Sequence, residues 1–416
     1  MNIESFIHQE ADKCVKCGLC LPHCPTYLKT RNEADSPRGR IALLQGLVEN
    51  ALELSPQLSG HIDGCLSCRA CEHACPSVVR FGQLMDAGRA LIKEREGRSA
   101  DHSRQARLTA RLRGKGLPIP LLRLYQKSGM QWLARRSGIL KRLGLERLDR
   151  YLPLLPRPAP WREVYGPVGD MRGSVALFTG CMGPFEQTSL EATASLLVQC
   201  GYRVHVPRAQ VCCGALDQHE GNLDTARAMA RSNINAFNAL SIDAVIFTAS
   251  GCGATLSEYQ ALAGQSFQTP VMDSTSFLQQ MAWPSHITFT PLARRVAVHD
   301  PCTLTHVLRT QNSVYSLLAL IPEIQLIPLP GNTFCCGAAG STMISQPEMA
   351  DTLLEDKIAA LDALQPDILV TSNIGCGLHL AAGIREAGLA VEVMHPVALL
   401  ERQVKGKDTR GKIQGK

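Results

Sequence analysis

Residues 14–25 read CVKCGLCLPHCP, and residues 65–76 read CLSCRACEHACP. Both stretches follow one pattern, C-x2-C-x2-C-x3-C-P, and the second begins 51 residues after the first. Three thiolates at this spacing can wrap a tight loop around one iron-sulfur cubane, while the fourth lies beyond a turn and reaches a second cubane. The repeated pattern therefore predicts two [4Fe-4S] clusters held in one small domain.

Each cluster of a two-cluster ferredoxin takes three cysteines from one motif and the last cysteine of the other. Zinc is the alternative metal, since C-x2-C pairs also form tetrahedral zinc sites. Those sites rarely present three cysteines at this spacing before Cys-Pro, and here the pattern occurs twice. The predicted ligands of the first cluster are Cys14, Cys17, Cys20 and Cys75, and those of the second are Cys65, Cys68, Cys71 and Cys24.

The insert between the two motifs carries two arginines, in the run Ser-Pro-Arg-Gly-Arg at residues 36–40. Arg38 and Arg40 either offset the negative charge of the clusters or contact a partner, or they lie in a solvated loop that leads into a helix over 41–49. The sequence leaves these alternatives open.

The length and composition of the chain indicate several globular domains. It has 416 residues, against roughly 100 to 200 for a single domain. No apolar run reaches the roughly 18 to 20 residues of a membrane-spanning helix, so any contact with a membrane is expected to be peripheral. The first twelve residues lack a secretory signal, which predicts a cytoplasmic protein, and there seventeen cysteines indicate metal ligands rather than disulfides.

One segment is strongly basic: residues 101–150 contain thirteen Lys and Arg against three acidic residues. The pattern from Gln83 to Arg150 is helical, with apolar residues between the arginines. Such a segment can lie on an anionic membrane or an acidic partner, or it can be an ordinary solvated helical face. We expect no nucleic-acid partner, because aromatic residues are few and no recognised motif is present. Four prolines within 151–160 predict an extended linker.

The second half of the chain repeats itself with a period of about 120 residues. The run Cys-Cys-Gly-Ala occurs at 212–215 and again at 335–338, and short β-branched runs alternate with helical stretches in both copies. This predicts two α/β units with their cysteines at the carboxyl ends of the strands, which we call the first and second Cys-Cys-Gly units. The eight repeated cysteines, expected to serve as further metal or redox groups, are Cys181, Cys212, Cys213, Cys252, Cys302, Cys335, Cys336 and Cys376.

Cys200 does not share this repetition, because its repeat partner is Ile321. We therefore expect Cys200 to be a small core hydrophobe. His219, His299 and His379 lie near the repeated cysteines, but none has a histidine at its repeat-equivalent position. We interpret them as ordinary packed side chains.

The predicted fold is a multi-domain α/β and α+β chain, in which an N-terminal two-cluster ferredoxin-like helical domain precedes two repeated α/β Cys-Cys-Gly units. The predicted boundaries are 1–95 for the cluster domain, 96–170 for the basic helical connector and Pro-rich linker, 171–290 and 291–402 for the two units, and 403–416 for a disordered tail.

The chain resembles the iron-sulfur subunit of bacterial glycolate oxidase (glycolate dehydrogenase). The resemblance runs from Cys14 through Pro-Arg-Gly-Arg at 37–40, both cluster motifs and the Cys-Cys-Gly runs to Ser-Gly-Cys-Gly-Ala at 250–254. It implies an electron-transfer subunit at the cytoplasmic face of the inner membrane, whose partners are FAD-binding subunits that oxidise glycolate to glyoxylate and whose acceptor is membrane quinone. No catalytic residue is expected in this chain, and no Rossmann G-x-G-x-x-G follows a strand.

The wider group with Cys-Cys-Gly runs also includes heterodisulfide reductase subunits, and its pattern ends in C-x2-C. Here Ala249 and Asn373 replace the first cysteine of that pair. Five cysteines in this family can hold a non-cubane cluster, so four per unit leave the metal of the C-terminal half open. The alternative functions are the equivalent subunit of a glycerol-3-phosphate or lactate dehydrogenase, and a heterodisulfide-reductase-like catalytic subunit that reduces a disulfide.

Overall fold

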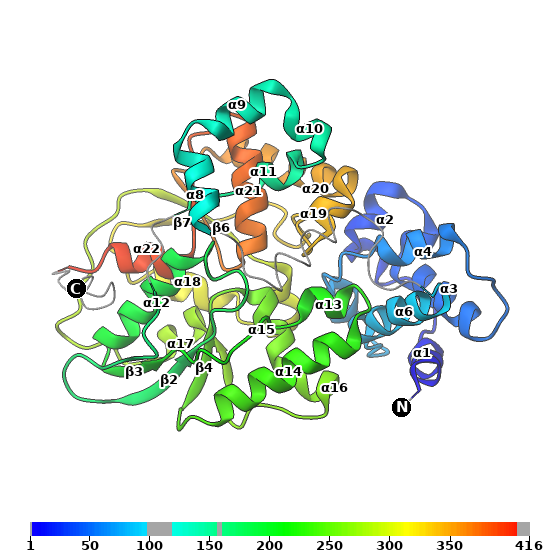
Figure 1. The fold of residues 1–416 in the computed structure, drawn as a ribbon, viewed down its shortest axis with the longest axis horizontal. Helices are drawn as coiled ribbons and strands as arrows, with labels where there is room; N and C mark the ends of the chain where they lie inside the picture. Colours follow the sequence, from blue (N-terminus) through cyan, green and yellow to red (C-terminus); the bar gives the residue numbers. More distant parts are fainter. Residues whose placement is uncertain (1, 98–118, 156–159, 406–416) are drawn as a thin grey trace.

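The computed structural model describes residues 2–97, 119–155 and 160–405. It contains an N-terminal helical domain, two α/β units and a group of short helices beside the second unit (Figure 1). The expected fold class is confirmed, since a helical dicluster domain precedes two α/β repeats. Residues 98–118 of the predicted connector and 406–416 of the predicted disordered tail lie outside the described residues.

The N-terminal domain packs its helices around a small apolar core. Ser36 and Ser55 each accept a hydrogen bond from the backbone N–H three residues on, and a proline follows each, so α3 and α4 begin at favourable caps. Helix α1 packs against α3 and α6, and Ile7, Leu44 and Met85 are fully buried. The elements are α1 (Ile3–Asp12), η1 (Leu21–His23), α2 (Pro25–Thr30), η2 (Glu33–Asp35), α3 (Pro37–Val48), α4 (Pro56–Asp63), α5 (Ala70–His73) and α6 (Phe81–Arg95).

The first Cys-Cys-Gly unit contains a five-stranded sheet in the order β1-β3-β2-β4-β5, parallel except for the edge strand β1. Strand β4 is buried along its whole length, as expected for a parallel sheet covered by helices. The strands are β1 (Val164–Tyr165), β2 (Gly173–Leu177), β3 (Tyr202–His205), β4 (Ala244–Phe247) and β5 (Val271–Asp273). The helices are α12 (Gln187–Gln199), α13 (Ala215–His219), α14 (Leu223–Asn238), α15 (Ser250–Ser257), α16 (Tyr259–Ala263) and α17 (Ser274–Gln280).

The second unit contains a parallel sheet in the order β7-β6-β8-β9, which matches β3-β2-β4-β5 of the first. The duplication in sequence is therefore also a duplication of topology, and the two units share a core where α12 meets α22. The strands are β6 (Arg295–His299), β7 (Gln325–Pro328), β8 (Ile368–Thr371) and β9 (Glu392–Met394). The helices are the π-helical turn η3 (Leu304–Leu308), α18 (Asn312–Leu318), α19 (Thr342–Ser345), α20 (Pro347–Leu364), α21 (Ile374–Glu386) and α22 (Pro396–Arg402).

The described part of the basic connector is a set of four short helices, not one continuous helix. Gly129, Gly138 and Gly144 separate them with φ of 79°, 70° and 68°, a left-handed backbone that ends a helix. We call α8 (Ile119–Lys127), α9 (Met130–Ser137), α10 (Ile139–Leu143) and α11 (Glu146–Arg150) the helical cap. It lies beside α20 and α21 (Figure 1), where Arg147 and Arg150 pair with Asp351.

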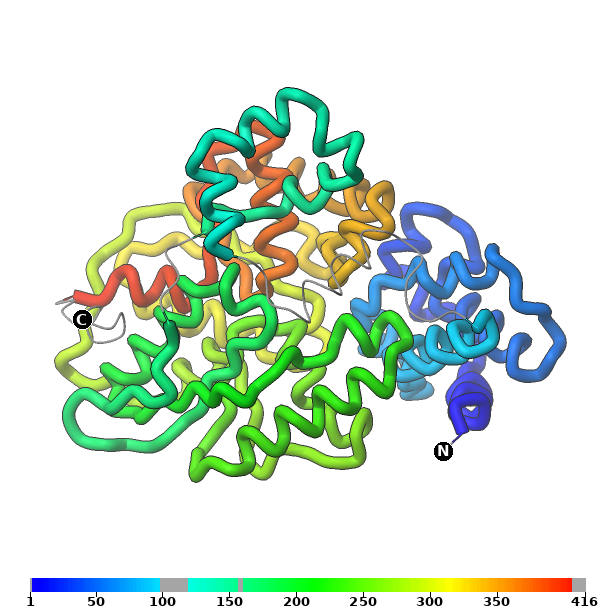
Figure 2. The backbone as a smooth tube through the Cα atoms, viewed as in Figure 1, coloured from blue at the N-terminus to red at the C-terminus, as the bar shows by residue number. Residues whose placement is uncertain are grey.

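The N-terminal domain contacts both Cys-Cys-Gly units: α6 meets α13 of the first, and α5 meets η3 of the second. Figure 2 shows the N-terminal domain, in blue, beside the green segment of the first unit. None of the helices in the described ranges is long and apolar enough to cross a membrane. The second cluster motif is thus positioned against the cysteine-bearing edge of the second α/β unit.

Candidate iron-sulfur and thiol sites

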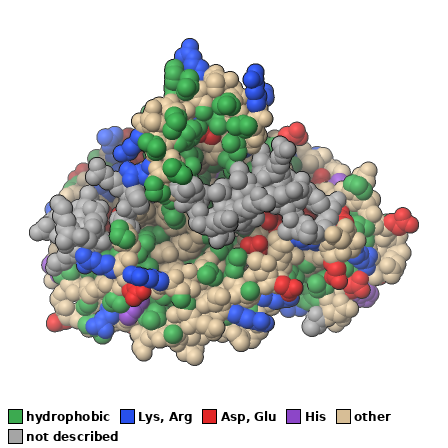
Figure 3. Space-filling view, viewed as in Figure 1, with side chains coloured by type: hydrophobic (Ala, Val, Ile, Leu, Met, Phe, Trp, Pro, Cys, Tyr) green, Lys and Arg blue, Asp and Glu red, His purple; other side chains and the backbone are tan. Residues whose placement is uncertain are grey.

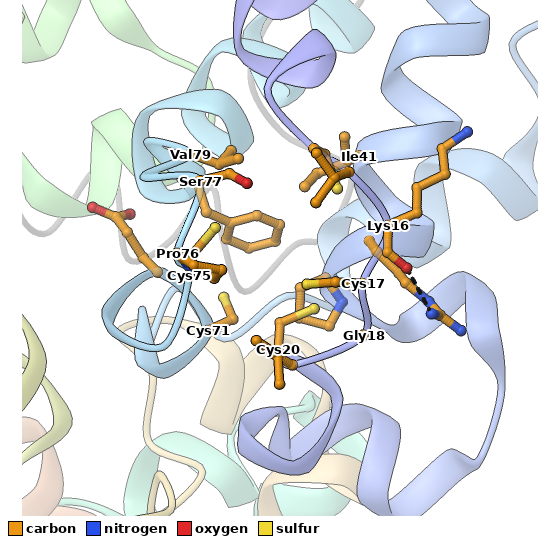
Figure 4. A pocket seen from close by; sticks show the side chains of 17 residues that line it. Lys16, Cys17, Gly18, Cys20, Ile41, Cys71, Cys75, Pro76, Ser77 and Val79 are labelled. Atoms are coloured by element: carbon orange, nitrogen blue, oxygen red, sulfur yellow. Dashed lines mark hydrogen bonds between the residues drawn. The ribbon is translucent and has the colours of Figure 1, made fainter.

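The first cluster motif surrounds a pocket at the surface of the N-terminal domain. Cys14, Cys17, Cys20 and Cys75 line it, with Cys71 on the wall that it shares with a second pocket. Figure 4 shows the sulfurs of Cys17, Cys20 and Cys75 directed toward the same open space. Cys17 is exposed to solvent. The four cysteines predicted for the first cluster therefore converge on one pocket.

The second pocket lies deeper and is lined by Cys24, Cys65, Cys68 and Cys71. All four are buried. Burial raises the pKa of the Cys68 and Cys71 thiols well above the ordinary value, and neighbouring thiols raise it further. Metal binding supplies the positive charge that turns such crowded thiols into thiolates. Each pocket thus offers the four sulfur ligands that a cubane requires.

The two loops share a strained backbone at matching positions. Lys16 and Gly18 in the first loop have φ of 55° and 84°, and Ser67 and Arg69, 51 residues later, have φ of 50° and 60°. Left-handed conformations are uncommon for residues other than glycine. Their recurrence at the same two positions indicates that both loops wrap an object of the same shape.

Buried guanidinium groups adjoin the second pocket. Arg40, 1% exposed, donates to Thr26 Oγ1 at 3.0 Å, and that hydroxyl lies 3.2 Å from Cys24 Sγ. Arg89 donates to the Cys65 carbonyl oxygen at 2.6 Å. Positive charge here favours a negatively charged thiolate cluster. Of the alternatives for the Pro-Arg-Gly-Arg run, the position of Arg40 favours charge compensation.

The four cysteines of the first Cys-Cys-Gly unit also come together. Cys212 Sγ lies 3.4 Å from Cys181 Sγ. The adjacent thiols of Cys212 and Cys252, together with burial, raise the pKa of Cys213 well above its ordinary value. The surroundings are apolar and aromatic, with Phe178 in the same buried cluster.

The second unit repeats this arrangement with Cys302, Cys335, Cys336 and Cys376, of which all but Cys302 are buried. The Gly337 N–H lies 3.4 Å from Cys335 Sγ, as the Gly214 N–H lies 3.5 Å from Cys212 Sγ in the first unit. The pKa of each of the four thiols is raised by burial and by neighbouring thiols. Two equivalent sets of four sulfurs therefore lie at the carboxyl ends of the two sheets.

Steric crowding explains why a glycine follows each cysteine pair. Gly214 and Gly337 have φ of 86° and 90°. A Cβ on Gly337 would lie 2.6 Å from the Ala350 carbonyl oxygen, and one on Gly214 would lie 3.3 Å from the Ala226 backbone. Only glycine lets the paired cysteines approach α14 and α20 this closely.

The second cluster pocket adjoins the thiols of the second unit. Cys68, Leu66 and Ala70 form one buried apolar cluster with Cys335 and Leu353, and Cys302 packs against it. Ion pairs surround this junction: Arg69 lies 2.6 Å from Glu258, and Lys29 lies 2.7 Å from Asp356. No residue of this junction was singled out in the sequence beyond its cysteines, because the pattern does not indicate which faces of two domains meet.

The three nearby histidines differ in their contacts. His219 pairs with Asp86 at 2.8 Å, and His379 lies 3.2 Å from the Ala350 carbonyl oxygen, as expected for packed side chains. His299 is different, because it approaches Cys336 and Cys376. Burial lowers the pKa of His299 to about 3, so its ring is neutral. Sequence reasoning set His299 aside because the first unit has no matching histidine; its place at the end of β6, three residues before Cys302, was the available signal.

Together these features define a two-cluster iron-sulfur protein with duplicated Cys-Cys-Gly units. Three family models match the chain: 4Fe-4S dicluster domain at residues 10–79, Cysteine-rich domain at 175–257 and 296–381, and Glycolate oxidase iron-sulfur subunit, linker region, at 118–155. The dicluster match establishes two [4Fe-4S] clusters as cofactors.

Curated relatives cover nearly the whole chain. It is 34% identical to the probable glycolate oxidase iron-sulfur subunit of Bacillus subtilis, over 93% of this chain and 92% of that one. It is 30% identical to the glycolate oxidase iron-sulfur subunit of Escherichia coli, over 94% and 93%. A more distant relative belongs to the dihydromethanophenazine:CoB–CoM heterodisulfide reductase of Methanosarcina barkeri, at 23% over 92% and 91%. The chain belongs to the family of glycolate oxidase iron-sulfur subunits, which confirms the resemblance noted from its sequence.

Proposed function

We propose that this chain takes electrons from an FAD-binding subunit that oxidises glycolate to glyoxylate, and passes them toward membrane quinone. The buried junction between Cys68 and Cys335 is the observation that carries the proposal. It connects the second cluster pocket with the thiols of the second unit through packed, buried side chains. When bound, the clusters supply one-electron transfer, which divides the electron pair of a reduced flavin.

The proposed outer ligand set is Cys14, Cys17, Cys20 and Cys75 at the first pocket, and the proposed inner set is Cys24, Cys65, Cys68 and Cys71 at the second. Cys17 belongs to the outer set, and its exposure suits electron entry from another protein. Val15, Leu19 and Val78, beside the first pocket, are 70%, 57% and 73% exposed, and such apolar side chains suit a docked partner. The inner set, around Cys68, faces the second unit. Electrons would therefore enter at the first pocket and leave through the second.

The helical cap is the proposed surface for peripheral binding to an anionic membrane. Residues 119–145 carry six Lys and Arg and no acidic residue. Hydrophobic side chains gather over the cap, with Lys and Arg at its outer end (Figure 3). Apolar insertion combined with cationic attraction to lipid headgroups is the pattern of interfacial helices. The exposed apolar side chains are Leu121, Leu124, Met130, Trp132, Leu133, Ile139 and Leu143.

The decisive experiment isolates the complex from its own host through a tag on this chain and measures quinone reduction driven by glycolate, lactate or glycerol 3-phosphate. Glycolate-driven reduction together with a co-purifying flavoprotein is the expected result. Reduction by lactate or glycerol 3-phosphate alone would keep the electron-transfer role and replace the substrate. Absence of any flavoprotein, with reduction of a disulfide instead, would overturn the proposal in favour of a catalytic subunit.

A further inference from the structure

His299 lies at the thiol site of the second Cys-Cys-Gly unit and is 2% exposed. One of its ring nitrogens and the Sγ atoms of Cys336 and Cys376 all lie within 4.8 Å of one another. A metal ion about 2.3 Å from each sulfur and about 2.0 Å from the nitrogen would place these atoms roughly 3.5 to 4 Å apart. Only small side-chain movements separate the present geometry from a bound one.

A hydrogen bond orients the imidazole. Nδ1 of His299 lies 2.9 Å from Thr371 Oγ1, on the neighbouring strand and opposite it in register. A neutral ring that donates from Nδ1 keeps its lone pair on Nε2. Metal-bound histidines are held in this way, with the second ring nitrogen bonded to a fixed acceptor.

The first unit offers an internal comparison. Phe178 occupies the position of His299, and its ring packs 6.1 Å from that of Phe237. A second pair of positions also differs. Asn233 of the first unit lies seven residues after Ala226, and Lys357 of the second lies seven after Ala350, so a neutral amide stands where the second unit has a cation. At these two pairs of equivalent positions, both within the described residues, the second unit therefore has an imidazole and a buried cation where the first has neither.

Lys357 supports the same conclusion by its position. It is 2% exposed, donates to the Gly331 carbonyl oxygen, and interacts electrostatically with Cys335, Cys336 and Cys376. A buried ammonium is costly unless negative charge lies nearby. Thiolates bound to a metal would supply that charge.

We propose that His299, Cys336 and Cys376 bind one metal centre in the second Cys-Cys-Gly unit, and that the metal site of the first unit has no nitrogen ligand. This rests on the proposed function only in that electrons pass to the second unit, and it is independent of the substrate. Replacing thiolate by imidazole makes a centre less negative, and in iron-sulfur centres histidine ligation raises the reduction potential. The second unit would then accept electrons from the adjoining [4Fe-4S] cluster.

The test uses the full chain isolated anaerobically from its own host, with and without ¹⁵N-histidine labelling. If the centre contains iron, pulsed electron paramagnetic resonance of the reduced protein should show a directly bound nitrogen whose coupling changes with the label. If it contains zinc, absorption at the zinc edge should show one nitrogen neighbour at about 2.0 Å. Whichever of these signals is found should disappear in His299→Cys, which keeps a ligand and should retain the metal.

His379→Gln is the matched control, because His379 is fully buried in the same unit but bonded to a backbone oxygen. It should keep the nitrogen signal. A nitrogen signal that survives in His299→Cys would overturn the proposal, and so would metal no greater than that of two [4Fe-4S] clusters. If the His299→Cys variant does not fold, absence of a nitrogen signal from the unaltered protein still overturns the proposal, and a nitrogen signal kept in His379→Gln still supports it. Glycolate-driven quinone reduction is measured in a separate assay. A failure of the proposed function is thereby distinguished from a failure of the proposed metal centre at His299.

Discussion

At the scale of single residues, Cys200 and Cys213 show how neighbours decide what a buried cysteine does. Cys200 is fully buried in the apolar core shared by the two units, among residues such as Leu196 and Leu197. Burial raises the pKa of its thiol to about 12, so it stays protonated. Cys213 is as buried but lies among other thiols, which a metal can bind together.

Cys200→Ala should therefore cost only stability. Removing one buried sulfur leaves a small cavity, worth about 1 kcal/mol of the free energy of unfolding. Iron and zinc content, measured by elemental analysis, should be unchanged, whereas Cys213→Ala should lose metal. A fall in metal content for Cys200→Ala would contradict this assignment.

Replacing one cysteine of each proposed ligand set should impair a different [4Fe-4S] cluster. Cys17→Ser should impair the first [4Fe-4S] cluster and Cys68→Ser the second, because each removes one thiolate from a different pocket. Either variant should block electron flow to quinone while the partner flavoprotein still reduces a dye with glycolate. Low-temperature electron paramagnetic resonance should show one altered cluster per variant. Undiminished flow to quinone would defeat the ligand assignment.

Glu186 predicts a pH dependence. It is buried beside Asp273, and burial raises the pKa of its carboxyl to about 7, although a hydrogen bond from Thr248 opposes the shift. Because the pKa of Glu186 is higher in the folded protein than in the unfolded chain, the folded state favours the protonated carboxyl. The folded protein is therefore most stable, with respect to this group, below the unfolded pKa of about 4.3, and it loses stability as pH rises toward 7. Glu186→Gln should thus gain stability over the unaltered protein between pH 5.5 and about 7, by about 1 to 3 kcal/mol. Melting curves across this range test it, with Glu191→Gln, at a partly exposed glutamate of α12, as the comparison variant.

At the scale of elements, the internal repeat predicted the fold of the second half better than the helical pattern predicted the structure of the basic connector. Matching Cys-Cys-Gly runs and β-branched strands were enough to predict two α/β units with cysteines at their strand ends, because parallel strands bring their carboxyl ends to one edge. The helical pattern over the connector did not reveal its breaks, since glycine is compatible with a weak helix as well as with a left-handed turn. The pattern did not predict His299 as a ligand, because a residue present in only one copy of the repeat gives no repeated motif.

The helical cap makes its own prediction. Trp132 and Leu133 are 63% and 60% exposed, so Glu at both positions should leave the fold intact while removing apolar insertion and adding repulsion from anionic lipid. Binding of the purified chain to vesicles containing anionic phospholipid should fall at least tenfold. Leu320→Glu, at an exposed leucine of the second unit, should bind as the unaltered chain does. Equal binding by the Trp132→Glu, Leu133→Glu variant, or no vesicle binding at all by the unaltered chain, would contradict this role.

At the scale of the whole molecule, the function depends on how the cluster domain sits against the two units. The residues that join them are far apart in sequence, such as Arg69 and Glu258, and their types are common on any surface. Periodicity and motif spacing describe one element at a time, so the sequence predicted the clusters and the thiol sets but not the junction between Cys68 and Cys335.

A partly buried pair, Asp86 with His219, joins the cluster domain to the first unit. Asp86 on α6 is 5% exposed and accepts hydrogen bonds from His219 at 2.8 Å and from Gln218 at 2.7 Å, both on α13. Burial alone would raise the pKa of Asp86, but His219 and Arg89 hold it below the ordinary value, so the carboxylate is charged in the folded protein. Asp86→Asn removes that charge and should weaken the contact between the cluster domain and the first unit by about 1 to 2 kcal/mol. This value is lower than for a fully buried pair, because His219 is partly exposed and solvent screens it.

The measurement that isolates this contact is a double-mutant cycle of Asp86→Asn and His219→Ala, followed by hydrogen exchange of α6 and α13 and by the rate of electron delivery to quinone. If the pair holds the domain in place, the two changes together should cost less than the sum of the single changes, by about 0.5 kcal/mol or more. Lys29→Met, which breaks the more exposed pair with Asp356, should change little. Strictly additive effects would mean that apolar contact at the Cys68 junction, not this pair, sets the position of the clusters.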